Sequence, residues 1–150
     1  MIRRAGGAVV AAAAVLVPAA TGNVGGAEWA TAIASPGVVN HGATLTLKLH
    51  YEMTCRQPGA GPVFVHLPAK MGVPRTLSVR VGAKPAPATV SGHDVTVQLP
   101  KPPAITCMSI GMGTLTLHLI GVRNPATAGT YLVRARVNGH AFTAQLAVRS

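Results

Sequence analysis

Alternation of apolar and polar side chains dominates residues 114–148 of the chain. Three alternating runs there are separated by two turn signals, Asn124-Pro125 followed by Gly129, and Asn138-Gly139. A period of two is typical of half-buried β-strands, and Asn-Gly between two such runs favours a two-residue hairpin turn. We therefore predict an antiparallel meander of three strands in this stretch, with a tight hairpin between the last two.

The same alternation recurs through the preceding residues. Its clearest run spans residues 44–54, where leucines at every second position alternate with threonines and charged side chains. Shorter runs occupy residues 62–67, 74–81, 88–90, 95–99 and 105–110, while residues 82–87 are expected to form a loop. About eight or nine short strands with turn residues between them predict a two-sheet antiparallel β-sandwich, with a closed barrel as the main alternative.

The first residues have the pattern of a secretory signal. Arg3 and Arg4 precede an apolar run that ends at Pro18, and small residues continue to Ala27. The run of about 13 apolar residues is shorter than the roughly 20 that a membrane-spanning helix needs. We expect a signal peptide and cleavage region over residues 1–27, and one secreted or envelope-associated domain over residues 28–150.

Export determines how the two cysteines are interpreted. In an oxidising compartment Cys55 and Cys107 have one possible internal pairing. Closing a loop of roughly 50 residues would stabilise the fold by about 4 kcal/mol in the chain-entropy model. Metal ligation is the alternative, because Met108 and Met112 lie close to Cys107 and soft sulfur ligands select Cu(I).

The charge of the chain suggests a class of partner. Thirteen Lys and Arg against three Asp and Glu give a formal net charge of +10. A strongly basic exported protein is expected to adhere to anionic polysaccharide or to a membrane surface, in a salt-dependent way, and a protein partner is a further possibility. Nucleic acid is not expected, because only 3% of the residues are aromatic and could stack on bases.

Candidate binding residues are basic side chains at outward positions of the predicted strands. If the strands that begin near Thr44 and Thr130 share a sheet, these side chains form one positive surface. A solvated face without function is an equal alternative, since the high Arg, Ala, Pro and Gly content also has a purely compositional explanation. The candidates are Lys48, His50, Arg80, Arg134 and Arg136.

Catalytic and metal-binding patterns are sparse. Paired-carboxylate chemistry is disfavoured because the chain has only three acidic residues, and no nucleophile motif surrounds its serines. The six histidines form no H-x-H or H-x-x-x-H pair, and most fall at outward positions. His50 and His118 are the pair most able to converge. We expect no enzymatic activity, no cofactor and no resident metal.

Several segments taken together resemble the immunoglobulin-like modules of bacterial cell-surface and secreted proteins. They are residues 42–49, 63–68 and 113–117, and above all residues 124–131, where Asn-Pro, small turn residues and Gly-Thr-Tyr precede the last hairpin. The resemblance implies an all-β, two-sheet antiparallel immunoglobulin-like sandwich. It also implies a non-enzymatic spacer, adhesive or ligand-binding role. Strong basicity and a disulfide are departures from those modules.

The sequence thus favours an exported binding or envelope-associated module that contacts anionic cell-surface material. A secreted copper-binding sandwich that uses His and Met ligands is the alternative. The run that ends in Cys55, followed by Val-x-Val-x-Leu-Pro at residues 63–68, is similar to such domains. Those domains typically begin with a metal-binding histidine, and no histidine precedes His41 here.

Overall fold

A computed structural model describes residues 27–101 and 107–150, and the regular secondary structure of those residues consists of β-strands. The predicted signal peptide lies almost entirely outside the described residues. Within them, no helix is long and apolar enough to cross a membrane. The strands of the described part are β1 (Trp29–Ser35), β2 (Gly42–Thr54), β3 (Gly61–His66), β4 (Ser78–Val81), β5 (Lys84–Ala86), β6 (Ala88–Ser91), β7 (Asp94–Leu99), β8 (Ile110–Arg123), β9 (Gly129–Val137) and β10 (His140–Val148).

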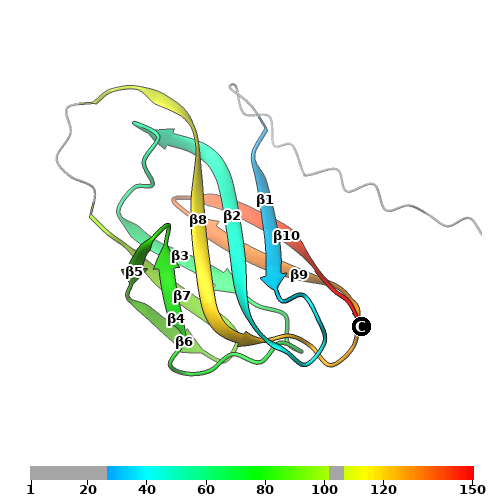
Figure 1. Cartoon of the computed structure of the whole chain (residues 1–150). Helices are drawn as coiled ribbons and strands as arrows, with labels where there is room; N and C mark the ends of the chain where they lie inside the picture. Colours follow the sequence, from blue (N-terminus) through cyan, green and yellow to red (C-terminus); the bar gives the residue numbers. More distant parts are fainter. Residues whose placement is uncertain (1–26, 102–106) are drawn as a thin grey trace, which may run out of the picture.

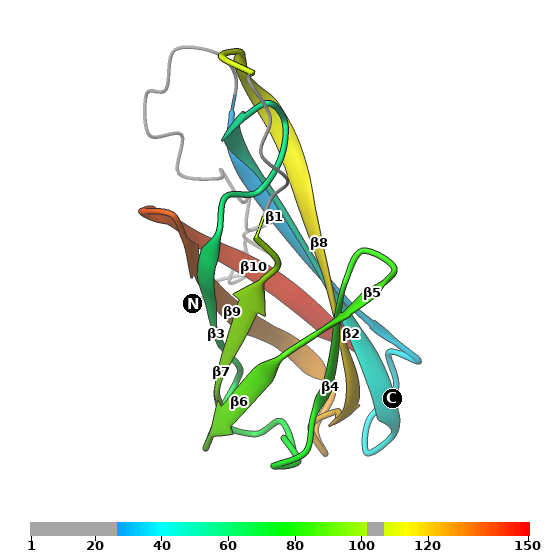
Figure 2. The same ribbon diagram turned by 90° about the vertical axis from the view of Figure 1, so that its left-hand side faces the viewer.

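The strands form two antiparallel sheets. The first sheet has the order β1-β2-β8-β4-β5, and the second sheet has the order β10-β9-β3-β7-β6. The two sheets pack against each other, as Figures 1 and 2 show from perpendicular directions. The predicted all-β, two-sheet antiparallel architecture is therefore confirmed.

Aliphatic side chains from both sheets fill the space between them. In β2 the alternation predicted from the sequence is followed without exception from Ala43 to Met53, with every second side chain buried. Leu117 and Leu119 of β8 and Val63 of β3 are also fully buried. Full burial of one such side chain contributes about 1.5–3 kcal/mol, so this periodicity is the main source of the fold's stability.

The predicted meander is wrong at its first connection. β8 pairs with β2 in the first sheet, whereas β9 pairs with β10 and β3 in the second, so the intervening turn crosses between sheets. Asn124 anchors this crossing, because its buried amide nitrogen donates hydrogen bonds to the carbonyl oxygens of Pro36 and Val38, each at 2.8 Å. Turn residues mark where a chain reverses, but they do not specify the sheet in which it continues.

The predicted hairpin between the last two strands is confirmed. β9 and β10 pair from Val137 and His140 outward, which leaves Asn138 and Gly139 as a two-residue loop. Both loop residues have positive φ, 47° and 80°, as the type I′ turn requires. The turn places the Asn138 side chain at the end of the sandwich.

Two other segments differ from the sequence predictions. Residues 84–86, expected in a loop, form the edge strand β5, which accommodates Pro85 because an edge strand has one side free of pairing. The separate strand expected at residues 105–110 is not present in the described residues 107–109, since β8 begins only at Ile110. Residues 102–106 lie outside the described residues.

A disulfide joins Cys55 to Cys107, with a Cα–Cα distance of 5.9 Å, as the sequence predicted. β2 ends at Thr54, and positive φ values at Cys55 and Arg56 turn the chain away from the sheet. The bond therefore ties the loop after β2 to the segment that leads into β8. Because both sulfurs are in the disulfide, neither is available as a thiolate ligand.

Candidate functional site

A basic cluster lies on the outer face of the second sheet. Arg134 and Arg136 of β9 are exposed and stand opposite His66 and Phe64 of β3, respectively. Phe64 exposes half of its surface to solvent. These four residues line a shallow depression, together with Asp94 at its rim, and we call it the arginine groove.

No acidic side chain among the described residues forms an ion pair with the two arginines of this groove. His66 Nδ1 lies 2.6 Å from Asp94 Oδ1, so the carboxylate at the rim is engaged by the imidazole. Among the described residues, no ion pair involves Arg134 or Arg136. Both guanidinium groups are thus available to bind an anion from solution, and guanidinium binds carboxylate, sulfate or phosphate oxygens in a bidentate manner.

The five predicted binding residues do not share one surface, which corrects the sequence interpretation. Lys48, His50 and Arg80 lie on the outer face of the first sheet. Arg134 and Arg136 lie on the outer face of the second sheet. The condition for a single surface is not met because β2 and β9 belong to different sheets. The alternation identified the outward side chains but could not assign them to a sheet.

Threonines and histidines dominate the outer face of the first sheet. His50 is hydrogen-bonded to Thr114 at 2.9 Å and stacks on Trp29, with ring centroids 4.9 Å apart. His118 is hydrogen-bonded to Thr46 at 3.1 Å. The two histidines lie on neighbouring strands, as expected, but each is held by a threonine on the strand beside it rather than by the other.

Metal binding gains no support from these placements. The described residues contain no group of three or more His, Cys, Asp or Glu side chains that could hold a metal ion. Met53 is buried in the core, whereas Met108 is almost fully exposed. The copper-binding hypothesis therefore gains no support from a cluster of His, Cys, Asp or Glu side chains in the described part of the chain.

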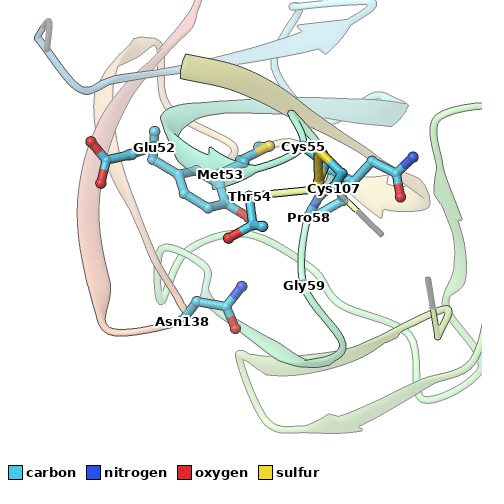
Figure 3. Close-up of a pocket in the computed structure, with 10 residues that line it drawn as sticks. Glu52, Met53, Thr54, Cys55, Pro58, Gly59, Cys107 and Asn138 are labelled. Atoms are coloured by element: carbon cyan, nitrogen blue, oxygen red, sulfur yellow. A yellow bond between two sulfur atoms is a disulfide. The ribbon is translucent and has the colours of Figure 1, made fainter. Parts of the chain in front are cut away.

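A pocket of about 360 Å³ opens at the disulfide end of the sandwich. It lies between the end of β2, the loop of residues 55–59, Cys107 and the β9–β10 turn. Figure 3 shows Asn138 on one side of this pocket, facing the end of β2, with Pro58 and the disulfide on another side. We call it the disulfide pocket. Sequence analysis did not predict it, because its walls come from three segments far apart in the chain.

Tyr51 is the most unusual side chain at this pocket. It is 1% exposed and packs against the rings of His140 and Phe142, at centroid distances of 5.0 and 5.8 Å. Its hydroxyl has no hydrogen-bond partner among the described residues. Burial raises the pKa of Tyr51 to about 12, an effect that the nearby Asn138 amide partly offsets. The amide is thus close enough to affect the phenol, but it does not meet the geometry of a hydrogen bond.

A second ion pair lies beside this tyrosine. His140 Nδ1 is 2.5 Å from Glu28 Oε1, and both side chains are largely shielded from solvent. The pair joins the residue that precedes β1 to the first residue of β10, so it connects the two sheets at one edge. Nothing in the sequence indicated this contact, because 112 positions separate the two residues.

Comparisons with known proteins give a likeness in fold. No family model and no curated protein matches the chain. The structure is similar to the crystal structure of BslA, described as a bacterial hydrophobin, with a TM-score of 0.51 and 20% sequence identity. The similarity covers 81% of this chain and 96% of that chain. At this level of identity it supports the all-β fold of two antiparallel sheets and no more.

Proposed function

We propose that the protein is an exported, non-enzymatic, immunoglobulin-like module that binds anionic polysaccharide of the cell envelope through the arginine groove. The observation that carries the proposal is the pair of exposed guanidinium groups without a carboxylate partner among the described residues, beside Phe64. Alternate residues of one strand are about 7 Å apart, so Arg134 and Arg136 can bind successive anionic groups of a polymer.

Strand order supports the immunoglobulin-like part of the proposal. The sequence β1-β2-β8-β4 facing β10-β9-β3 follows the A-B-E-D and G-F-C order of that sandwich. Tyr131, near the start of β9, donates a hydrogen bond to the carbonyl oxygen of Thr127, as in a tyrosine corner. The additional strands β5, β6 and β7, and a disulfide that does not join the two sheets through β2 and β9, are departures from the immunoglobulin pattern.

Three observations support the exported and envelope-associated part. The chain has a formal charge of +10, its two cysteines form a disulfide, and its fold is similar to that of a bacterial hydrophobin. Disulfides persist in oxidising, extracytoplasmic compartments. Adhesion of a basic protein to anionic polymers requires no catalytic group. Of the three acidic residues of the chain, Glu28 and Asp94 are already paired with histidines.

Two variants of equal charge test the groove. Arg134→Glu with Arg136→Glu and, as the matched control, Lys48→Glu with Arg80→Glu each lower the net charge by the same amount, on opposite outer faces. Binding to immobilised polygalacturonate and dextran sulfate is measured against rising NaCl. We expect the groove variant to lose most of its binding and the control to lose little. Equal losses in both variants would show that net charge alone drives adhesion and would refute the proposal.

Anionic lipid is the other polyanion that the groove could contact. Sedimentation with vesicles containing phosphatidylglycerol measures this alternative for the same variants. Vesicle binding without polysaccharide binding would show that the groove binds a membrane surface and not a polysaccharide.

Adsorption to an interface is a second candidate function, favoured by exposed apolar side chains at the start of β8. Met108 is 96% exposed and Ile110 is 67% exposed. Figure 2 shows the C-terminal end of β2 and the start of β8 projecting beyond the second sheet, and Ile110 is the first residue of β8. The likeness to a protein described as a bacterial hydrophobin gives this candidate additional support.

Surface tension at the air–water interface tests this second candidate. We expect wild type to lower the surface tension, and Met108→Ser with Ile110→Ser to slow adsorption. Ile33→Ser, at an exposed apolar residue on the outer face of the first sheet, is the control. If wild type leaves the surface tension of buffer unchanged, the candidate is excluded.

A further inference from the structure

We propose that the disulfide pocket is a binding site for a neutral sugar, separate from the arginine groove. The pocket lies at one end of the sandwich, whereas the groove lies on the outer face of the second sheet. Its volume of about 360 Å³ falls within the range of small-ligand sites. The chemistry of its walls specifies the class of ligand.

The hydroxyl group of Tyr51 is the first element of the argument. It is buried and has no hydrogen-bond partner among the described residues, although the residue lines the pocket. Buried polar groups are nearly always satisfied, so an exception indicates a missing partner such as a water or a ligand. Its oxygen has less than 1 Å² of exposed surface, so a sugar hydroxyl reaches it only when a side chain of the pocket wall moves aside. That hydroxyl can then both donate to and accept from the phenol.

Two carboxamides complete the polar part of the pocket. Gln57 and Asn138 each offer one acceptor oxygen and two donor hydrogens, which suits neighbouring hydroxyls of a sugar ring. The Asn138 amide is fixed in place by the turn, where φ is 47°, and by the close approach of the loop. A Cβ at Gly59 would lie 3.1 Å from its Nδ2 atom, so glycine permits this approach.

Charge excludes the other common ligand classes. No Lys, Arg or His side chain is among the described residues that line the pocket, and Glu52 is the one acid there, so anions are disfavoured. A purely apolar ligand would leave the phenol and both amides without partners. Met53, Pro58 and the disulfide supply apolar surface against which the C–H groups of a sugar ring can pack. A neutral hexopyranose satisfies both kinds of wall.

Two substitutions in the pocket and one outside it test the proposal. Tyr51→Phe removes the unpaired hydroxyl and keeps the buried ring. Asn138→Gly removes the carboxamide and keeps the positive φ of the turn. Asn40→Gly is the matched control, since Asn40 also has a positive φ, 61°, but does not line the pocket. Each protein is titrated with glucose, galactose, mannose, N-acetylglucosamine and their disaccharides, and binding is followed by NMR.

We expect wild type and Asn40→Gly to bind at least one of these sugars saturably, with chemical-shift changes at residues 51–59 and 138. Each pocket variant should weaken that binding about five- to tenfold, the effect of losing one hydrogen bond. Absence of saturable binding to the whole panel would mean that water alone occupies the pocket and would overturn the proposal. Binding that both pocket variants retain unchanged would overturn it too. Neither result bears on polyanion binding by the groove.

Discussion

Replacing Tyr51 with phenylalanine should stabilise the protein at neutral pH, in contrast to most changes at a fully buried residue. The hydroxyl is buried without a hydrogen-bond partner among the described residues, and its removal relieves a desolvation penalty of about 1–3 kcal/mol. The ring contacts with His140 and Phe142 do not involve the hydroxyl and are retained. A gain of this size is a large fraction of the roughly 5–15 kcal/mol that stabilises a typical domain.

The advantage of the variant should increase at alkaline pH. Burial raises the pKa of Tyr51 from 10.0 in the unfolded chain to about 12 in the folded protein. Between these values the unfolded chain releases the phenolic proton while the folded protein keeps it, so wild type loses stability as the pH rises. At pH 11 the loss relative to Tyr51→Phe is about 1.4 kcal/mol, and it is absent below pH 9.

Urea unfolding at pH 7, 9 and 11 measures both effects. The fluorescence of Trp29, the chain's one tryptophan, reports the transition in both proteins. Comparing the two proteins at each pH cancels the titration of the lysines and of the other tyrosine. A variant less stable than wild type at pH 7 would show that the hydroxyl has a partner. A difference that stays constant from pH 9 to pH 11 would refute the raised pKa.

Three further changes test the fold. Replacing Cys55 and Cys107 with alanine should lower the free energy of unfolding by about 4 kcal/mol, because the bond closes a loop of 52 positions; a chemical denaturation curve unchanged from wild type would contradict this. Asn124→Ala should cost about 1–3 kcal/mol, since it removes two hydrogen bonds at the crossing, and thermal unfolding measures the loss. Gly113→Ala would place a Cβ 2.6 Å from the buried Met53 sulfur and should cost about 1–3 kcal/mol, which calorimetry detects, with Gly42→Ala as an unobstructed control.

Periodicity predicted the strands well where one face is buried and the other is solvated. β2 and the β9–β10 hairpin are at the predicted positions, because leucine or valine at every second residue fixes which face turns inward. The disulfide was predictable for a different reason, since a single pair of cysteines allows one internal bond. The short strand β5 was missed because Pro85 reads as a loop signal unless the strand is known to lie at an edge.

Sheet membership could not be read from the same periodicity. A two-residue period specifies the outward side chains of each strand, but β8 pairs with β2 across more than fifty residues of intervening chain. The placement of Lys48 and Arg134 on opposite faces follows from that long-range pairing. The pocket was equally invisible, because it requires the loop after β2 and the Asn138 turn to meet at one end of the molecule.

The two candidate sites depend on different parts of the architecture. The arginine groove is fixed by the main-chain register of β3 with β9, which sets Phe64 beside Arg136 and His66 beside Arg134. The disulfide pocket instead depends on loop contacts, above all on the approach of Gly59 to Asn138 and on the bond between the two cysteines. Loops tolerate sequence change that a paired register does not. If the two proposals above hold, changes in these loops would alter the sugar preference of the pocket without disturbing polyanion binding at the groove.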